Sequence, residues 1–303
     1  MKRKWLIALF LTMSAVCTAG CGGAGKTGET DAVEEHEDAD GWDMADVIVK
    51  KLQDNDPEFA DYSVDVEEFG GIYLQEALTD NETDKAEEAR IAKANTEALR
   101  QAFEKVSVYE KDGKKGGRVI IHDGYFYTGA IHMESNVNLH LDDGANVMFT
   151  TDYSQYPNVL TRWEGIICYN YSPLIYAYQK DHIAITGNGV FNGQATTDKY
   201  WLPWKNGSVD KNENQKYAKE KLRQMGQEQV PVEERVFGGG SYLRPSFVQP
   251  YECTNVLIEG VTIEDAPFWM VHPVFCENVI IRGVTVNSFG YNNDGINPDS
   301  CRY

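Results

Sequence analysis

Basic residues are scarce in this chain of 303 residues, which has 28 Lys and Arg against 47 Asp and Glu and a formal net charge of −19. Residues 29–46 hold nine carboxylates and no Lys or Arg. Because nucleic acids are bound in basic grooves, this balance argues against nucleic acid as a partner.

The N-terminal apolar run is too short for a membrane span. Basic residues at 2–4 precede an apolar run over residues 5–16, and small residues lead to Cys21. This pattern predicts a signal peptide over residues 1–21. Thr18-Ala19-Gly20-Cys21 resembles a bacterial lipobox, with Thr18 in place of the usual Leu. We expect an extracellular protein with a lipid on Cys21 that anchors it to the bacterial cell surface; plain secretion is the alternative.

The last third of the chain repeats one six-residue phrase, at residues 248–253, 271–276 and 296–301. Each copy reads aliphatic, amide or imidazole, Pro, two variable residues and Cys. The text that follows the first two copies also repeats, as 255–263 against 278–286. Units of this length bury their apolar faces only by stacking. Since they are rich in Val, Ile and Thr and too short for a crossover helix, we predict an all-β fold, a parallel β-solenoid with coils about 4.8 Å apart.

The cysteine spacing follows the same repeat. Cys253, Cys276 and Cys301 are separated by 23 and 25 residues, and Cys168 lies apart from them. These cysteines lie on successive coils and form no C-x-x-C knuckle, so we predict no metal site there. An interior column of thiols is favoured. Disulfides between adjacent coils stay open, because export permits them and the strand spacing allows them.

The rest of the chain divides into four parts. Residues 22–61 are acidic and polar and are predicted to tether the folded domain of residues 62–303, whose first strand is expected near 62–66. Residues 84–106 predict a helix that caps the open end of the solenoid, with Asn95 or Thr96 capping its second half. An insertion at 196–242 contains a charged helix, which either overhangs a functional groove or covers a side sheet.

Alignment on the cysteines predicts a polar column. Gln249, His272 and Asn297 share one repeat position, and Asp294 falls beside Trp269. For the three column residues alone, an internal hydrogen-bonded ladder is the favoured interpretation.

A bulge beside this column favours a binding groove. The 25-residue offset leaves two extra residues, so the chain is expected to bulge at 287–291 and to lift Asn292 and Asp294 toward solvent. With Asn292, Asn293 and Asp294 on the same face, four hydrogen-bonding side chains and a carboxylate converge.

Residues 292–301 resemble the N-T-D-G motif of glycoside hydrolase family 28, the polygalacturonase family, and especially its bacterial members. The resemblance extends to residues 135–137, 232–238 and 267–273 and covers roughly residue 60 to the end. It implies a right-handed parallel β-helix of the pectin-lyase-like type. It also implies inverting hydrolysis of α-linked galacturonan or a related pectic chain, with no cofactor. Pectic polysaccharide or oligogalacturonide is then the expected partner, and we expect a monomer.

The resemblance assigns roles to particular residues. Asp294 matches a carboxylate that positions or activates the attacking water, and Asn292 matches the motif Asn beside the substrate. The other expected substrate-binding residues are Asn293, Asn297, His272, Trp269 and Gln249. Two positions depart from the family pattern, because Asn293 replaces Thr and Asn297 stands where a further Asp is usual. The second change bears on substrate choice.

The following coils of the family carry a D-D pair with the general acid, a G-H-G histidine and an R-x-K pair, and none of these motifs follows residues 292–301 in this sequence. The expectation is therefore a C-terminally truncated, incomplete solenoid without turnover, which turnover in a reducing-sugar assay would overturn. Two alternatives stand beside the hydrolase. One is a surface-anchored glycan-binding solenoid; the other is a pectate lyase, which needs a calcium-binding carboxylate cluster that the repeated column lacks.

Overall fold

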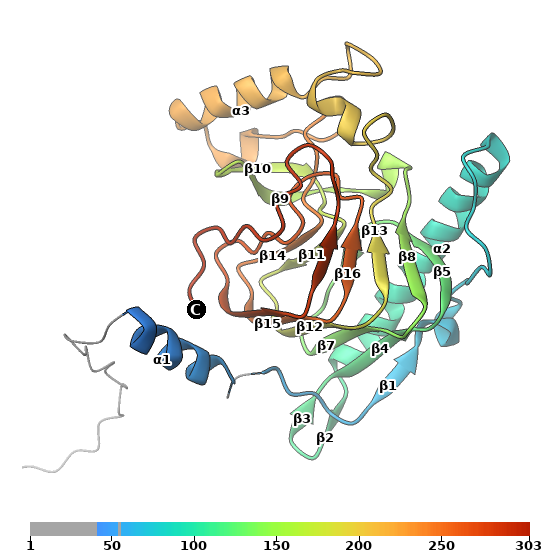
Figure 1. Cartoon of the computed structure of the whole chain (residues 1–303), viewed down its shortest axis with the longest axis vertical. Helices are drawn as coiled ribbons and strands as arrows, with labels where there is room; N and C mark the ends of the chain where they lie inside the picture. The colour runs from blue at the N-terminus through green and yellow to red at the C-terminus, as the bar shows by residue number, and fades with distance from the viewer. Residues whose placement is uncertain (1–40, 54–55) are drawn as a thin grey trace, which may run out of the picture.

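The computed structural model describes residues 41–53 and 56–303 of the chain. The predicted signal peptide, the predicted lipid-attachment residue Cys21 and about half of the predicted tether lie outside these residues. Figure 1 shows parallel strands stacked coil upon coil, with helix α2 beside the first coils and helix α3 over a hairpin. Among the described helices, none combines the length and apolarity needed to cross a membrane.

Three parallel sheets carry the repeat. Sheet 1 has six strands: β1 (Ser63–Asp65), β4 (Gly117–Ile121), β7 (Val137–Leu141), β12 (Asp181–Gly187), β15 (Thr254–Glu259) and β17 (Glu277–Arg282). Sheet 2 has five: β5 (Gly124–Thr128), β8 (Ala145–Phe149), β13 (Val190–Asn192), β16 (Thr262–Glu264) and β18 (Thr285–Asn287). Sheet 3 has three: β6 (Ile131–His132), β11 (Ile175–Tyr178) and β14 (Val248–Tyr251).

The strand registers confirm the predicted repeat. Val256 pairs with Val279, as the 23-residue offset requires. Ile183 pairs with Val137, an offset of 46 residues and thus twice 23, so the same period extends into the middle of the chain. Parallel sheets with apolar residues facing a common core confirm the expectation of a mainly β fold.

Left-handed backbone recurs where the chain enters sheet 1. Asn136, His182, Asn255 and Asn278 hold the same repeat position, and all have φ between 51° and 63°. Asn tolerates this conformation better than most residues, which explains its recurrence there. The amide of Asn278 also donates to Asn255 Oδ1 at 3.0 Å, so the turns are tied together from coil to coil. After each strand, glycine makes the next turn: a Cβ on Gly187 would lie 1.9 Å from the Leu141 carbonyl oxygen.

Helix α2 (Glu82–Ser107) forms where the sequence predicts a helix. Its apolar stripe lies in the main core: Ala98, Leu99, Ala102, Phe103 and Val106. The prediction that Asn95 or Thr96 caps its second half is wrong, because the helix is continuous and begins at the Asn81 cap. Asn95 is instead fully buried and bonds Ile72 and the Tyr127 carbonyl, which ties the helix to β5.

The described residues before β1 include a helix and an ion pair to sheet 1. Helix α1 (Gly41–Gln53) lies within the stretch predicted as a tether, and Asp56 pairs with Arg282 of β17 at 2.7 Å. β1 is followed by the 3-10 helix η1 (Val66–Phe69), and a small hairpin joins β2 (Glu110–Lys111) to β3 (Lys114–Lys115).

The insertion packs against an antiparallel hairpin that the sequence analysis missed. This hairpin pairs β9 (Asn158–Trp163) with β10 (Ile166–Tyr171). Helix α3 (Lys216–Gln227) buries Leu222 in a second core with Trp163 and Phe268, whereas Tyr217 is 87% exposed. Three further 3-10 helices lie nearby in sequence: η2 (Tyr153–Gln155) precedes β9, and η3 (Leu202–Lys205) and η4 (Val232–Glu234) flank α3 within the insertion.

The three repeat cysteines form a column of free thiols in the turns between sheet 3 and sheet 1: Cys253 lies between β14 and β15, and Cys276 directly precedes β17. Cys253 and Cys276 are buried and Cys301 is partly buried. The thiol of Cys276 contacts the Pro250 carbonyl oxygen at 3.2 Å, and that of Cys301 contacts the Pro273 carbonyl oxygen at 3.3 Å. The structure therefore has the interior thiol column and no disulfide among these residues.

Candidate functional site

The polar column lies where the repeat predicts it. Backbone bridges join Val248 to Val271 and Val271 to Ile296, so the residues that follow them stack in register. These are Gln249, His272 and Asn297. Gln249 and His272 have no exposed surface, because hairpin β9–β10 covers them and Thr161 donates to Gln249 Oε1 at 2.5 Å. Gln249 therefore cannot contact a ligand directly and can influence one only through the residues that it hydrogen-bonds.

Gln249 fixes the protonation of His272. Its Nε2 donates to His272 Nδ1 at 2.8 Å, so Nδ1 is the acceptor and the proton of the neutral ring lies on Nε2. A second proton on Nδ1 would face the Gln249 amide donor. Burial lowers the pKa of His272 to about 4, although Asp299, 3.8 Å from Nε2, opposes this shift. His272 is thus a neutral donor near neutral pH.

We expect the acid sensitivity of the fold to depend on His272. Its folded pKa lies below the unfolded value of 6.5, so its stabilising effect is complete above pH 6.5 and is lost as the pH falls toward 4. The shift corresponds to a loss of about 3 kcal/mol in the free energy of unfolding, at about 1.4 kcal/mol per pKa unit. Denaturant titrations at several pH values should show this loss in the native protein and a smaller loss in His272→Gln. A pH slope of stability in His272→Gln equal to that in the half-buried control His182→Gln would contradict the assignment.

Two atoms of the column are buried without a hydrogen-bond partner among the described residues: His272 Nε2 and Asn297 Oδ1. Buried polar atoms are nearly always paired, so orphans of this kind mark positions completed by water or a ligand. Asn297 Nδ2 donates to Asp294 Oδ2 at 3.3 Å, and Asp294 is exposed. An unpartnered donor, an unpartnered acceptor and an exposed carboxylate thus lie on two adjacent coils at this column.

Asp299 and Arg162 form a second charged pair beside this face, and the sequence analysis did not select either residue. Asp299 Oδ1 lies 3.1 Å from Arg162 Nη1, which also donates to Ser300 Oγ at 3.0 Å. Arg162 comes from β9, 137 residues before Asp299, so no sequence spacing joins them. Its guanidinium lies over the Phe275 ring at 4.9 Å.

Arg244 holds Asn292 in place. Its guanidinium has no exposed surface and donates to Asn292 Oδ1 at 2.9 Å and to the Tyr291 and Pro267 carbonyl oxygens at 2.7 and 2.9 Å. Its Nε donates to Gln215 Oε1 at 3.0 Å, in the insertion. Burial lowers its pKa to about 10, against the opposing charge of Glu164. Arg244, which the sequence analysis did not select, therefore holds the predicted bulge at 287–291 in one conformation through Tyr291 and Asn292.

Asn293 fixes the same loop from within. It donates to the Ala266 and Phe268 carbonyl oxygens at 2.9 and 3.0 Å and accepts from Ser288 Oγ at 2.8 Å and Gly290 N at 2.6 Å. These four bonds occupy the whole amide, so the structure gives Asn293 a positioning role.

Replacing Asn293 with Thr, the residue of the family motif, is expected to destabilise this protein by about 2–3 kcal/mol. A threonine hydroxyl has one donor and cannot satisfy two carbonyl oxygens and two donors at once, and each buried group left unpaired costs about 1–3 kcal/mol. Chemical unfolding of Asn293→Thr and of the matched control Asn287→Thr, on exposed β18, measures the difference. Equal stability of the two variants would show that the four bonds are replaceable.

Aromatic rings border the candidate site. Trp269 meets His272 edge to face, with ring centroids 4.7 Å apart, and stacks on Phe268 at 4.8 Å. Phe268 stacks in turn on Trp163 of the hairpin at 5.4 Å. Trp269 is only partly buried, so its ring offers a surface on which a sugar face can pack.

A hollow of about 710 Å³ continues from Arg162 and Phe275 along hairpin β9–β10 and α3, and Arg223 and Arg235 also line it. Of its three arginines, Arg162 pairs with Asp299 and Arg223 pairs with Glu164. A larger hollow, of about 1260 Å³, lies on the outer face of sheet 1, where acids and bases alternate. It contains none of the predicted site residues, so the candidate site remains on sheet 3.

Comparison with known proteins identifies relatives in sequence and in fold. No family model matches the chain. A region of 215 residues, 68% of the chain, is 27% identical to a Vitis vinifera protein named "Probable polygalacturonase" and spans 37% of it. The solved structure of a hyperthermoactive exopolygalacturonase from Thermotoga maritima is 42% identical over 85% of this chain, with a TM-score of 0.71. A family 28 exopolygalacturonase from Yersinia enterocolitica shares the fold at 21% identity, 77% coverage and a TM-score of 0.52.

These similarities place the chain among relatives of the polygalacturonases and support a relationship with glycoside hydrolase family 28. The fold is that of their parallel β-helical structures. The chain spans 54% of the Thermotoga maritima protein, 40% of the Yersinia enterocolitica protein and 37% of the grape protein.

Proposed function

We propose that this protein is an inverting glycoside hydrolase that cleaves α-linked galacturonosyl bonds of pectic chains at the Asp294 face of sheet 3. The observation that carries this proposal is the meeting of exposed Asp294 with the unpartnered Nε2 of His272 and Oδ1 of Asn297. The identity to an exopolygalacturonase supports it. The right-handed, closed β-helix of that family is part of the proposal.

Asp294 is the residue that activates or positions the attacking water. It is exposed, and its only side-chain hydrogen bond among the described residues comes from Asn297 at 3.3 Å, which leaves oxygen lone pairs for a water molecule. Inversion uses a second carboxyl group to protonate the leaving oxygen from the other side of the sugar. We assign no residue of this column to that acid, since Asp299 is engaged by Arg162.

The arginines favour an acidic sugar. Arg162, Arg223 and Arg235 line the hollow beside the site, and guanidinium groups match carboxylates in shape and charge. Arg223 and Arg162 are each paired with an acidic residue, at 3.0 and 3.1 Å. A uronate that enters the hollow would share or replace these partners, whereas a neutral galactan has no charge with which to do so.

Incubation of the protein with polygalacturonate tests the reaction class. Residues 1–303, in which no general acid is assigned, are expected to give no product; where a second carboxyl group supplies that acid, we expect saturated products with new reducing ends, and activity that survives a metal chelator. Ultraviolet-absorbing unsaturated products would identify a lyase. Binding of oligogalacturonate without any product, even where the general acid is supplied, would identify a glycan-binding solenoid.

The mode of cleavage is a finer part of the proposal. Both family relatives among the solved structures described above are exopolygalacturonases, and we propose exo action here. The expected result is early release of short galacturonides with a slow fall in polymer viscosity. A rapid fall in viscosity at low conversion would show endo action.

We also propose export and lipid anchoring at Cys21, from the sequence pattern alone. Mass spectrometry of the mature N-terminus should find a diacylglycerol-modified Cys21 in the native protein and none in Cys21→Ser. An unmodified N-terminus released to the medium would show plain secretion.

A further inference from the structure

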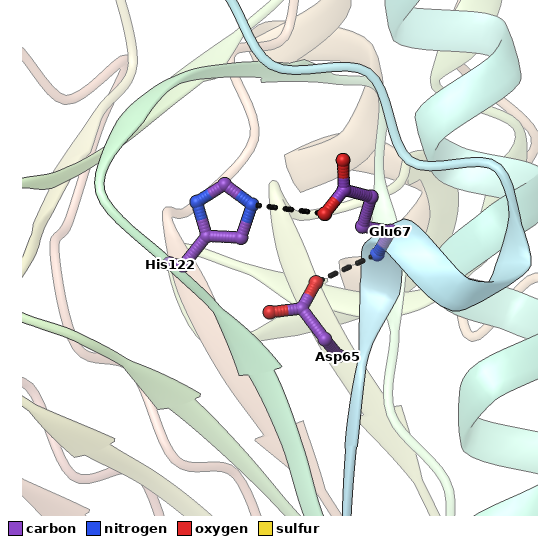
Figure 2. A group of neighbouring side chains, drawn as sticks. All are labelled: Asp65, Glu67 and His122. Carbon is purple, nitrogen blue, oxygen red and sulfur yellow. Dashed lines mark hydrogen bonds and ion pairs between the residues drawn. The ribbon is translucent and has the colours of Figure 1, made fainter.

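We propose a second site, remote from the polar column: a binding site for one divalent transition-metal ion formed by Asp65, Glu67 and His122. One ligand atom from each of the three side chains lies within 4.8 Å of the other two, and the structure contains no ion. Figure 2 shows the His122 ring turned toward the Glu67 carboxylate, with the Asp65 carboxylate beside both. The residues come from β1, from η1 and from the turn between β4 and β5.

The tautomer of His122 carries the argument. Its Nδ1 lies 2.9 Å from the Asp123 carbonyl oxygen, which can only accept, so Nδ1 bears the proton. Nε2 of the neutral ring then presents a lone pair. Metal-binding histidines usually donate their other ring N–H to a carbonyl or carboxylate in this way.

His122 Nε2 and Glu67 Oε2 face each other, and both are hydrogen-bond acceptors, so no proton donor joins them. Nε2 lies 3.8 Å from Glu67 Oε2, which is beyond hydrogen-bonding distance. Two ligands of a tetrahedral zinc ion, each about 2.0–2.2 Å from the metal, lie about 3.3–3.6 Å apart. A cation between Nε2 and Oε2 therefore requires a shift of only a few tenths of an ångström, and the Glu67 side chain is 71% exposed and free to make it.

The other two ligands are held in place. The Tyr73 ring stacks on His122 with centroids 3.6 Å apart and an interplanar angle of 19°. Asp65 is the N-cap of η1: its Oδ1 accepts from Glu67 N at 2.7 Å, and its own N–H donates to Glu68 Oε1 at 3.0 Å. This capping box orients the Asp65 carboxylate and leaves its second oxygen for a ligand.

The ligand set selects the class of ion. One imidazole and two carboxylates suit Zn²⁺ and its neighbours, with water in the fourth position. Ca²⁺ takes six to eight oxygen ligands, which this cluster does not supply. His122 belongs to the β4–β5 turn, whereas Asp65 and Glu67 belong to β1 and η1. The ion would therefore link the three-residue edge strand β1 and helix η1 to the first full coil. Its role is structural, at the N-terminal end of the solenoid.

Zinc titration of the whole chelator-treated protein by calorimetry tests the site, with Ca²⁺ as comparison. We expect one Zn²⁺ site that weakens more than about 100-fold in His122→Gln, because loss of even an outer-shell partner costs about 10–100-fold. His182→Gln is the matched control: His182, like His122, is a half-buried histidine beside an aspartate, Asp181, at 2.9 Å. Zinc at 100 times its Kd should raise the melting temperature by about 5 °C in the native protein and in His182→Gln.

The visible absorption spectrum of bound Co²⁺ distinguishes this site from a site with cysteine ligands. Co²⁺ bound by Asp65, Glu67 and His122 should show visible d–d bands without the thiolate charge-transfer band that cysteine ligands produce. These bands should disappear in His122→Gln and persist in His182→Gln. Zinc binding that is equal in both variants, a thiolate band, or Ca²⁺ binding as tight as Zn²⁺ binding would overturn the proposal. Since the site lies apart from the Asp294 face, these outcomes do not depend on the proposed hydrolysis.

Discussion

Replacing Asp294 with Asn is expected to lower the turnover of galacturonan by the active protein about 100- to 10,000-fold, the contribution of a positioned general base. Asn has nearly the same shape and keeps an oxygen for the 3.3 Å contact with Asn297, but it cannot accept a proton from water. Binding of oligogalacturonate should therefore change by only a few fold. Initial rates and calorimetric Kd values for the same oligosaccharide give both quantities.

Asp299→Asn supplies the comparison for this prediction. Asp299 pairs with Arg162 at 3.1 Å, so its loss should alter substrate binding and KM more than kcat. A fall in kcat that is as large for Asp299→Asn as for Asp294→Asn would show that the two carboxylates act together. Turnover within about tenfold of native in Asp294→Asn would remove Asp294 from the chemistry.

Replacing Arg244 with Ala is expected to destabilise the protein by about 3–5 kcal/mol, the upper range for single substitutions. The guanidinium is completely buried and serves four acceptors, two of them main-chain carbonyl oxygens in the segments beside the site. Each acceptor left unpaired costs about 1–3 kcal/mol, and water in the vacated space recovers part of that cost. Thermal and denaturant unfolding measure the loss.

The variant Arg244→Lys shows whether stability depends on the positive charge at this position or on the hydrogen-bonding geometry of the guanidinium. Lysine keeps the positive charge but lacks the planar fork that reaches Asn292, Tyr291 and Pro267 together. We expect a stability between those of the native protein and Arg244→Ala, and weaker oligogalacturonate binding because Asn292 loses its support. Native stability in Arg244→Lys would show that charge alone matters here.

The repeat made sheets 1 and 3 predictable. The phrase at 255–263 and its copy at 278–286 fixed the register of β15 on β17, since a slip of one residue would turn the apolar face outward. The column of Gln249, His272 and Asn297 followed from the same alignment. Local patterns of this kind suffice where each coil repeats its neighbour.

The support of the site was not predictable, because it comes from segments outside the repeat. Arg162 and Thr161 reach the column from hairpin β9–β10, and Arg244 reaches Asn292 across 48 residues. Asparagine often caps helices, but Asn95 lies inside helix α2. It is buried and hydrogen-bonds Ile72 and Tyr127, which are distant in sequence. Contacts that depend on packing between non-repeating segments leave no periodic signal in the sequence.

Calorimetric titration with α-linked trigalacturonate and with its methyl ester tests the central claim most directly, namely that the Asp294 face binds an acidic sugar chain. Hydrogen bonds between charged groups are about twice as strong as neutral ones. We therefore predict that the acid binds at least about tenfold more tightly than the ester, a difference of about 1.4 kcal/mol, and that Trp269→Ala weakens binding of the acid. Equal affinity for acid and ester, or acid binding that Trp269→Ala leaves unchanged, would contradict the account.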